Sequence, residues 1–239
     1  MGRHHSTTPD RAAIRRITAL GLIVFLAGIA APVALPKSAS QDWSADMARF
    51  AHEDAGSPTP DGCVLFVGSS SIRLWGTLAT DFPEVTVLNR GFGGSHIADS
   101  IVHFDRLVAP HNPRLIVFYA GTNDIAAGRL PEDVAADFRE FCSMLHAAKP
   151  EARVMFISLQ FAPSRWNLRE KVALTNAYVA AFCAADPRRT FVDSNSVTMS
   201  ADGRPRPELY VGDQLHMNAA GYEVWADLLR PLVQPKSSD

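Results

Sequence analysis

The chain has 239 residues, of which 47% are hydrophobic and 20% are charged. A chain of this composition can bury a sizeable core, so an intrinsically disordered protein is excluded. Lysine and arginine number 23 against 25 acidic residues, so the net charge of −2 shows no basic excess that would favour nucleic acid as a partner. The three cysteines are too few for a fold built on disulfide bonds.

The first 40 residues differ from the rest in charge and hydropathy. They hold five basic residues and one acid, a net charge of +4, which leaves −6 for residues 41–239. Residues 17–36 carry no charge and include an almost wholly apolar run, so residues 1–40 are predicted to be a signal peptide or an N-terminal membrane anchor. Because Pro32 and Pro36 shorten any spanning helix, we favour a cleaved signal peptide, and the protein is expected in the periplasm or outside the cell. Association with the inner membrane through residues 17–36 is the alternative.

Strand-like and helix-like segments alternate along the remaining chain. Residues 41–62 are expected to form a short helix over 44–52 and a linker rich in Gly and Pro, and residues 63–235 a catalytic domain. The predicted strands are 63–67, 85–89, 115–119, 154–158 and 190–193, and the main predicted helices are 97–107, 131–148, 168–184 and 219–233. Short continuous runs rich in Val, Ile and Phe are typical of parallel strands covered on both faces. The sequence therefore predicts a three-layer α/β/α, flavodoxin-like domain with a five-stranded parallel sheet.

Polar segments follow several of the predicted strands. They are residues 68–72 after the first strand, 90–95 after the second, 120–124 after the third, and a loop with Asp213 and His216 after the last. Each segment alone also fits an ordinary turn or helix cap. Because ligands bind at the carboxyl ends of parallel strands, however, the four segments are expected to meet at one edge of the sheet. Together they supply a hydroxyl, an imidazole, a carboxylate, a side-chain amide and backbone amides, the groups needed for acyl transfer by a serine nucleophile.

The same four segments resemble the sequence blocks of the SGNH, or GDSL, hydrolases, and they occur in that family's order. Residues 67–72 (Val-Gly-Ser-Ser-Ser-Ile) resemble the first block, residues 89–94 the second, residues 121–124 (Gly-Thr-Asn-Asp) the third, and Asp213-x-x-His216 the last. The longer string over 66–75 is similar to a bacterial subgroup of the family. Ser69 stands where the family usually has aspartate.

The resemblance implies a role for each matching residue. Ser70 would be the nucleophile, His216 the general base, and Asp213 the acid that orients the imidazole. The oxyanion hole would consist of the backbone N–H groups of Ser70 and Gly94 and the side-chain amide of Asn123.

The substrate pocket is less well defined by the sequence. The loop-like stretch 161–171 could form one wall, with Arg165 and Trp166 as candidate contacts and a solvated loop as the alternative, and His96 is a further candidate. Arg73 and Trp75 are predicted to have structural roles.

The predicted function is that of a lipase-like serine ester hydrolase acting on a small-molecule or glycan ester. No phosphate loop or His-Glu-x-x-His motif is present, so neither a cofactor nor a metal is implied. Two alternatives use the same acyl-transfer chemistry of a serine nucleophile, namely an O-acyltransferase acting on an envelope glycan and a thioesterase. A third is a non-catalytic binding module anchored at the envelope. The acyl chain, the natural alcohol and the oligomeric state stay open.

Overall fold

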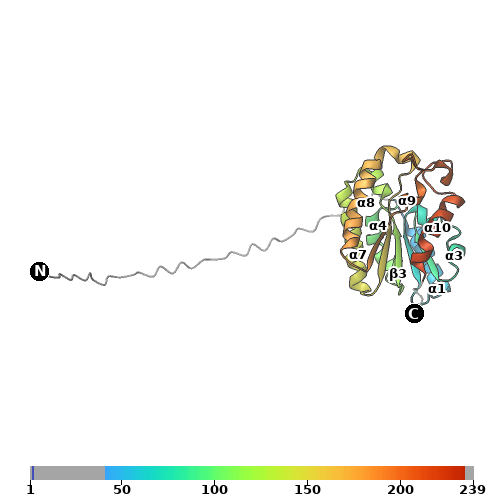
Figure 1. Cartoon of the computed structure of the whole chain (residues 1–239). Coiled ribbons are helices and arrows are strands. Elements are labelled where there is room, and N and C mark those ends of the chain that lie inside the picture. The colour runs from blue at the N-terminus through green and yellow to red at the C-terminus, as the bar shows by residue number, and fades with distance from the viewer. Residues whose placement is uncertain (1, 3–40, 235–239) are drawn as a thin grey trace. The chain divides into compact units, whose positions relative to one another are not determined.

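A computed structural model describes residue 2 and residues 41–234 of the chain, so the predicted signal peptide or anchor lies outside the described residues. Residues 41–234 form a five-stranded, wholly parallel sheet with the strand order β2-β1-β3-β4-β5, covered by helices on both faces (Figure 1). The predicted three-layer α/β/α architecture is therefore confirmed. Within this described part, no helix is both long enough and apolar enough to cross a membrane.

The strands lie close to their predicted positions. They are β1 (Val64–Gly68), β2 (Val87–Gly91), β3 (Leu115–Tyr119), β4 (Arg153–Ile157) and β5 (Arg189–Val192). The helices are α1 (Ser44–Gly56), α2 (Ser70–Arg73), α3 (Leu78–Asp81), α4 (Ile97–Val102), α5 (Phe104–Leu107), α6 (Thr122–Ala126), α7 (Pro131–Ala148), α8 (Arg169–Ala184), α9 (Asn195–Thr198) and α10 (Ala219–Val233). Two short 3₁₀ segments, η1 (Pro163–Leu168) and η2 (Pro207–Leu209), complete the described elements.

Strand β1 shows how the sheet builds two cores. Its side chains alternate between the faces, as the two-residue period of a strand requires, and all five of its residues are buried. Leu65 and Val67 belong to the core under α1, α4, α5, α7 and α8. Val64 and Phe66 belong to the opposite core with Trp75, which thereby has the structural role predicted for it, and with the inner face of α10. Burial on both faces explains why the strand sequence is continuously apolar.

Three predicted elements needed correction. The second strand begins at Val87 rather than at residue 85, because the N–H of Val85 donates to the carbonyl of Phe82 and closes a turn there. The single helix predicted over 97–107 is two short helices, since His103 between α4 and α5 has ψ of 15°, outside the helical range. The stretch predicted as loop-like over 161–171 contains the 3₁₀ segment η1 and the start of α8.

Helix α1 belongs to the domain and fixes the end of β2. Phe50 on α1 is fully buried in the core, and the guanidinium of the fully buried Arg90 lies 4.9 Å from the centre of its ring. Arg90 Nη1 donates to Glu53 at 3.0 Å, and Nη2 donates to Asp54. Arg90 is the penultimate residue of β2, so this network holds the glycine-rich segment that follows the strand.

Candidate active site

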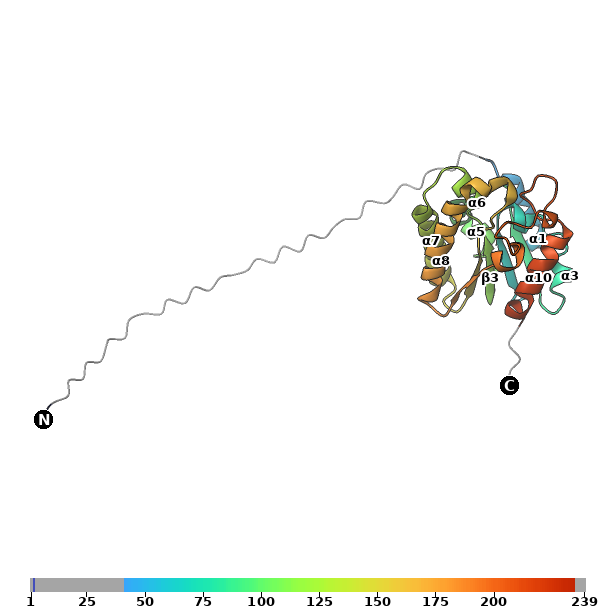
Figure 2. The same ribbon diagram turned by 45° about the horizontal axis from the view of Figure 1, so that its top comes forward.

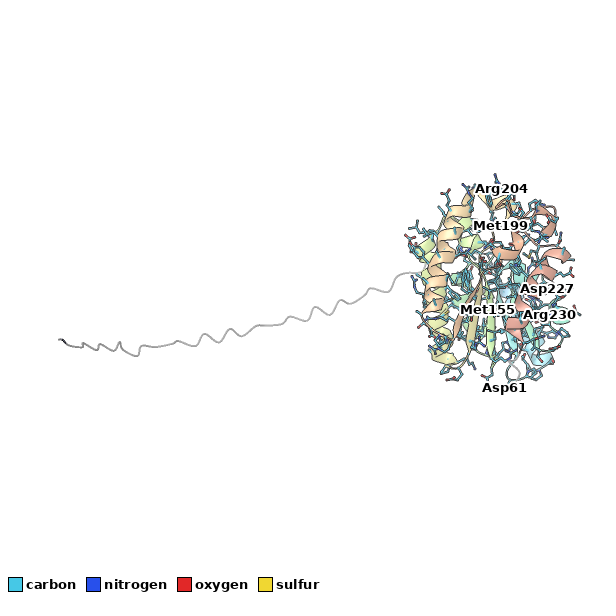
Figure 3. The ribbon with its side chains drawn as sticks, in the orientation of Figure 1. Asp61, Met155, Met199, Arg204, Asp227 and Arg230 are labelled. Carbon is cyan, nitrogen blue, oxygen red and sulfur yellow. The ribbon has the colours of Figure 1, made fainter. Side chains whose placement is uncertain are left out.

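The four polar segments named above meet at the carboxyl end of the sheet. Asp61, which precedes β1, lies at one end of the domain, and Arg204 lies at the opposite end (Figure 3). Helix α6, which begins directly after β3, lies at that opposite end, and turning this end toward the viewer brings α6 forward (Figure 2). One groove is lined by Ser70, Gly94, Asn123 and His216, one residue from each segment, so the expected convergence of the strand-end segments is present.

The three consecutive serines differ in exposure, and of the three only Ser70 lines both of the hollows described below. Ser69 and Ser71 are buried, whereas Ser70, the first residue of α2, is half-buried. Gly68 has φ of +156°, and a Cβ there would lie 2.0 Å from the carbonyl oxygen of Tyr119, so β1 can turn into α2 at this point only with glycine. This sharp turn leaves the Ser70 hydroxyl exposed beyond the strand end.

Ser70, His216 and Asp213 form a continuous chain of hydrogen bonds. The hydroxyl oxygen of Ser70 lies 2.8 Å from Nε2 of His216, and Nδ1 of the same ring lies 2.6 Å from Oδ2 of Asp213. Because Asp213 binds one ring nitrogen, the proton on Nδ1 is held there and Nε2 is left as an acceptor for the serine proton. The sequence places Ser70 and His216 146 positions apart, and the fold brings them into direct contact.

The backbone also holds the Asp213 carboxylate in place. Its Oδ1 accepts the backbone N–H groups of Leu215 at 2.8 Å and of His216 at 2.9 Å. These hydrogen bonds, with the side-chain bond to His216, lower the pKa of Asp213 to about 2, so the carboxylate is ionised at neutral pH. Gln214, in the same turn, has φ of +56°, the one positive φ among the described non-glycine residues. A strained residue between the acid and the base is consistent with a functional turn.

Three hydrogen-bond donors belong to residues that line one hollow beside the Ser70 hydroxyl. Among the described residues, the backbone N–H groups of Ser70 and Gly94 have no acceptor. Gly94 has φ of +78°, which a glycine adopts without strain. The side-chain amide of Asn123 is fixed at both ends, because Nδ2 donates to the carbonyl of Ser95 at 3.1 Å and Oδ1 accepts both Nη1 and Nη2 of Arg165 at 3.1 Å. The second hydrogen on Nδ2 therefore stays available.

Two hollows adjoin Ser70. A narrow pocket of about 10 Å³, more enclosed than open and called the enclosed pocket below, is lined by Ser70 and His216 together with Tyr119, Gln160 and Arg165, among others. This volume holds about one water-sized group. An open groove of about 360 Å³ is lined by Ser70 and His216 together with Gln41, Asp46, Arg73 and Arg165, among others. Ser70 therefore borders a narrow space and a wider, more open one.

The three candidate pocket residues from the sequence have different positions. Arg165 lines both hollows, whereas His96 and Trp166 line neither. His96 precedes α4, where its backbone N–H donates to Asp99 at 2.7 Å, and its Nδ1 lies 3.9 Å from the buried carboxylate of Asp124. The ring of Trp166 instead packs against the guanidinium groups of two arginines, Arg169 at 5.4 Å and Arg204 at 4.9 Å.

Sequence reasoning missed several residues that line the hollows, among them Arg73 and Gln160. Arg73, expected to be structural, lines the open groove, and its guanidinium lies against Gly93, where an added Cβ would be 2.9 Å from Nε. Gln160 lines the enclosed pocket, is 3% exposed, and has no partner for either amide atom within the described part of the chain. Its place soon after β4 was the available signal, because the other site segments also follow strand ends. In residues 41–234, no cluster of three or more His, Cys, Asp or Glu side chains could hold a metal ion.

A comparison with protein-family models identifies one family. The sequence model of the GDSL-like lipase/acylhydrolase family matches residues 56–224. A structure from Bacteroides fragilis assigned as an acylhydrolase is 25% identical, with a TM-score of 0.69, covering 81% of this chain and 98% of that chain. A GDSL-like lipase from Bacteroides thetaiotaomicron is 22% identical with a TM-score of 0.69, covering 79% and 97%. A catalytic mutant of an acetylxylan esterase from Geobacillus stearothermophilus shares the fold at 14% identity and a TM-score of 0.58, covering 74% and 96%. None of the curated proteins compared with the sequence matches it significantly.

Proposed function

Because the chain belongs to the GDSL-like lipase/acylhydrolase family, we propose that it is a serine esterase that cleaves carboxylic esters through an acyl-enzyme. The observation that carries the proposal is the hydrogen-bond chain from Ser70 through His216 to Asp213. In this assignment Ser70 is the nucleophile, His216 the general base and acid, and Asp213 the group that orients the ring and stabilises its cationic form.

The reaction proceeds in two balanced steps. In the first, Ser70 Oγ forms a bond to the ester carbonyl carbon while its proton moves to Nε2 of His216, and the tetrahedral intermediate then breaks the bond to the alcohol oxygen, which takes that proton and leaves. In the second, water attacks the acyl-enzyme and gives its proton to His216. Breakdown of this intermediate releases the acid and returns the proton to Ser70. The products are one carboxylic acid and one alcohol.

The oxyanion of each tetrahedral intermediate would be held by the N–H groups of Ser70 and Gly94 and by Nδ2 of Asn123. All three have a hydrogen without an acceptor in the described structure. Such fixed donors stabilise charge that develops only in the transition state, and removing one typically lowers kcat by 10²–10³-fold. Arg165 contributes indirectly, because its two contacts with Oδ1 hold the Asn123 amide in the required orientation.

The acyl group is proposed to be short. The enclosed pocket beside Ser70 has a volume of about 10 Å³, which suits a methyl-sized group such as that of an acetyl ester. The open groove is the larger space and would take the alcohol. An acetylxylan esterase with the same fold is consistent with acetyl esters as the substrate class.

The reaction is proposed to take place outside the cytoplasm, with the basic and apolar residues 1–40 as the export or anchoring segment. Cell fractionation of the full chain beside a variant lacking residues 17–36 tests this. The full chain is expected in the periplasm, medium or membrane, and the deletion variant in the cytoplasm. Equal cytoplasmic recovery of both would contradict export.

Hydrolysis of p-nitrophenyl acetate by the purified full chain tests the catalytic proposal. Ser70→Ala is expected to abolish turnover, whereas Ser57→Ala, at an exposed serine after α1, is expected to retain it. Rates should fall as the acyl group is lengthened from acetyl to butyryl and octanoyl, since the enclosed pocket does not admit the longer chains. Equal rates for Ser70→Ala and the unmodified chain would remove the serine-esterase assignment and favour a non-catalytic binding role.

A further inference from the structure

The open groove beside Ser70 carries positive charge in a domain that is otherwise acidic. Residues 41–239 have a net charge of −6, yet two arginines, Arg73 and Arg165, line the groove. Asp46 also lines the groove, but its carboxylate pairs with Arg49 at 3.1 Å. Asp213 is engaged with His216 and the backbone. Neither groove arginine therefore has a carboxylate partner among the described residues.

Arg73 is held in the groove by its backbone and by the glycines opposite it. A Cβ at Gly91 would lie 2.3 Å from the backbone nitrogen of Arg73, and a Cβ at Gly93 would lie 2.9 Å from its Nε and 3.1 Å from its Nη2. The chain therefore accommodates Arg73 by having glycine at both positions. Its guanidinium makes no hydrogen bond or ion pair with any described residue, and the exposed side chain lines both this groove and a neighbouring hollow, so its donors are open to solvent.

No carboxylate among the described residues forms an ion pair with the guanidinium of Arg165. It is half-buried, and its only hydrogen bonds within the described part of the chain go to the neutral oxygen of Asn123. Burial lowers the pKa of Arg165, as expected when no anion lies close enough to offset the loss of hydration. Its Nε–H, together with the outer hydrogen of one Nη, is unused, and this edge of a guanidinium matches the two oxygens of a carboxylate.

We propose that the alcohol portion of the ester substrate carries a carboxylate, which binds in the groove between Arg73 and Arg165. This inference rests on the proposed esterase function and names its substrate class, a short-chain acyl ester of an acidic alcohol such as an acidic sugar or a hydroxy acid. The carboxylate belongs to the alcohol because the enclosed pocket has room only for a short acyl group. Of the two hollows that His216 lines, only the groove is lined by both arginines.

The test compares two acetate esters that differ in charge, 4-acetoxybenzoate and the neutral 4-acetoxybenzamide, with each enzymatic rate divided by the rate of hydroxide-catalysed hydrolysis. The full chain is expected to show at least a tenfold higher corrected kcat/KM for the anionic ester at low salt. The preference should shrink as salt is added, because ions screen charges in an open groove. An unchanged preference at high salt would contradict a role for the arginine charges.

Three variants test which residues cause the preference for the anionic ester. Arg73→Gln is expected to lower the anionic-to-neutral ratio of kcat/KM about tenfold, and Arg165→Gln to lower the same ratio while also slowing both esters through Asn123. Arg139→Gln, at an exposed arginine on α7 that does not line the groove, should keep the ratio of the unmodified chain.

The two proposals fail in different ways. If neither ester is hydrolysed faster than by Ser70→Ala, the esterase function itself is wrong. If both are hydrolysed with a ratio near one, and Arg73→Gln does not change it, the esterase function stands and the carboxylate site is wrong.

Discussion

Replacing Asp213 with asparagine changes which nitrogen of His216 carries the proton. Oδ1 of Asp213 accepts two backbone N–H groups, from Leu215 at 2.8 Å and His216 at 2.9 Å. In Asp213→Asn the amide oxygen must occupy this position, because the NH₂ group would face two donors there. The NH₂ group then lies where Oδ2 was, 2.6 Å from Nδ1 of His216, and donates to it. The ring proton moves to Nε2, which no longer accepts the proton of Ser70.

The expected loss in kcat is about 10⁴-fold, the size found when the equivalent exchange is made in a Ser-His-Asp protease, and it corresponds to about 5.4 kcal/mol of transition-state free energy. The fold should be preserved, since the carboxamide keeps the same size and both backbone hydrogen bonds. The variant therefore separates catalysis from stability.

The assay is the turnover of p-nitrophenyl acetate by Asp213→Asn, with circular dichroism and thermal unfolding as checks on the fold. Asp227→Asn is the matched control, because this exposed aspartate on α10 makes only a surface ion pair with Arg230. Figure 3 shows both residues on the outer side of α10. A loss in kcat below tenfold in a folded Asp213→Asn protein, beside an inactive Ser70→Ala protein, would refute the assigned role of Asp213.

Three further outcomes are expected from the same structure. Asn123→Ala should fold normally and lose 10²–10³-fold in kcat, measured with p-nitrophenyl acetate, and turnover close to that of the unmodified chain would exclude Asn123 from the oxyanion hole. Gly68→Ala should fail to give soluble folded protein, since its Cβ would lie 2.0 Å from the carbonyl oxygen of Tyr119. Gly76→Ala is the control and should fold, because a Cβ there has nothing within 4 Å. Equal melting temperatures for the two variants would contradict the close approach at Gly68. The pKa of Asp213 is lowered to about 2, so its contribution to stability is present above pH 4 and lost as the pH falls toward 2. This contribution is about 1 kcal/mol once the 46% exposure of the side chain is allowed for. In Asp213→Asn the denaturation midpoint should therefore change less with pH between pH 4 and pH 2 than in the unmodified chain.

The sequence was sufficient for the fold and for the residues that meet at the strand ends. Continuous apolar strands and alternating helices determine a parallel sheet, and parallel strands place their following residues at one edge. Ser70, Asn123 and His216 could be grouped on this basis although they are far apart in the chain. The turn at Val85 and the break between helices at His103 could not be predicted from the sequence, because each depends on backbone geometry that apolar periodicity does not encode.

The lining of the two hollows was predicted less well, for a different physical reason. Gln160 faces the enclosed pocket from a short loop after β4, and Arg73 faces the groove because two glycines on the neighbouring β2 segment leave room for it. Both placements depend on contacts between segments, not on the pattern within one segment. His96 was selected for its nearness in sequence to Gly94, but its position before α4 directs it to Asp124.

The net charge of the chain shows why the substrate was also difficult to infer from composition. A total of −2 is the sum of a basic N-terminal segment and an acidic domain, and neither sum describes the groove. Charges in solvent are screened within about 8–10 Å at physiological salt, so a bound substrate responds to the few groups beside it. Beside Ser70 those groups are Arg73 and Arg165, and the two can be distinguished. Arg165 also holds Asn123, so its substitution should lower kcat for every ester, whereas Arg73 touches no proposed catalytic group and its substitution should act mainly through KM for the anionic ester. The same fall in kcat for both variants on the neutral ester would show that Arg73, too, supports the catalytic geometry.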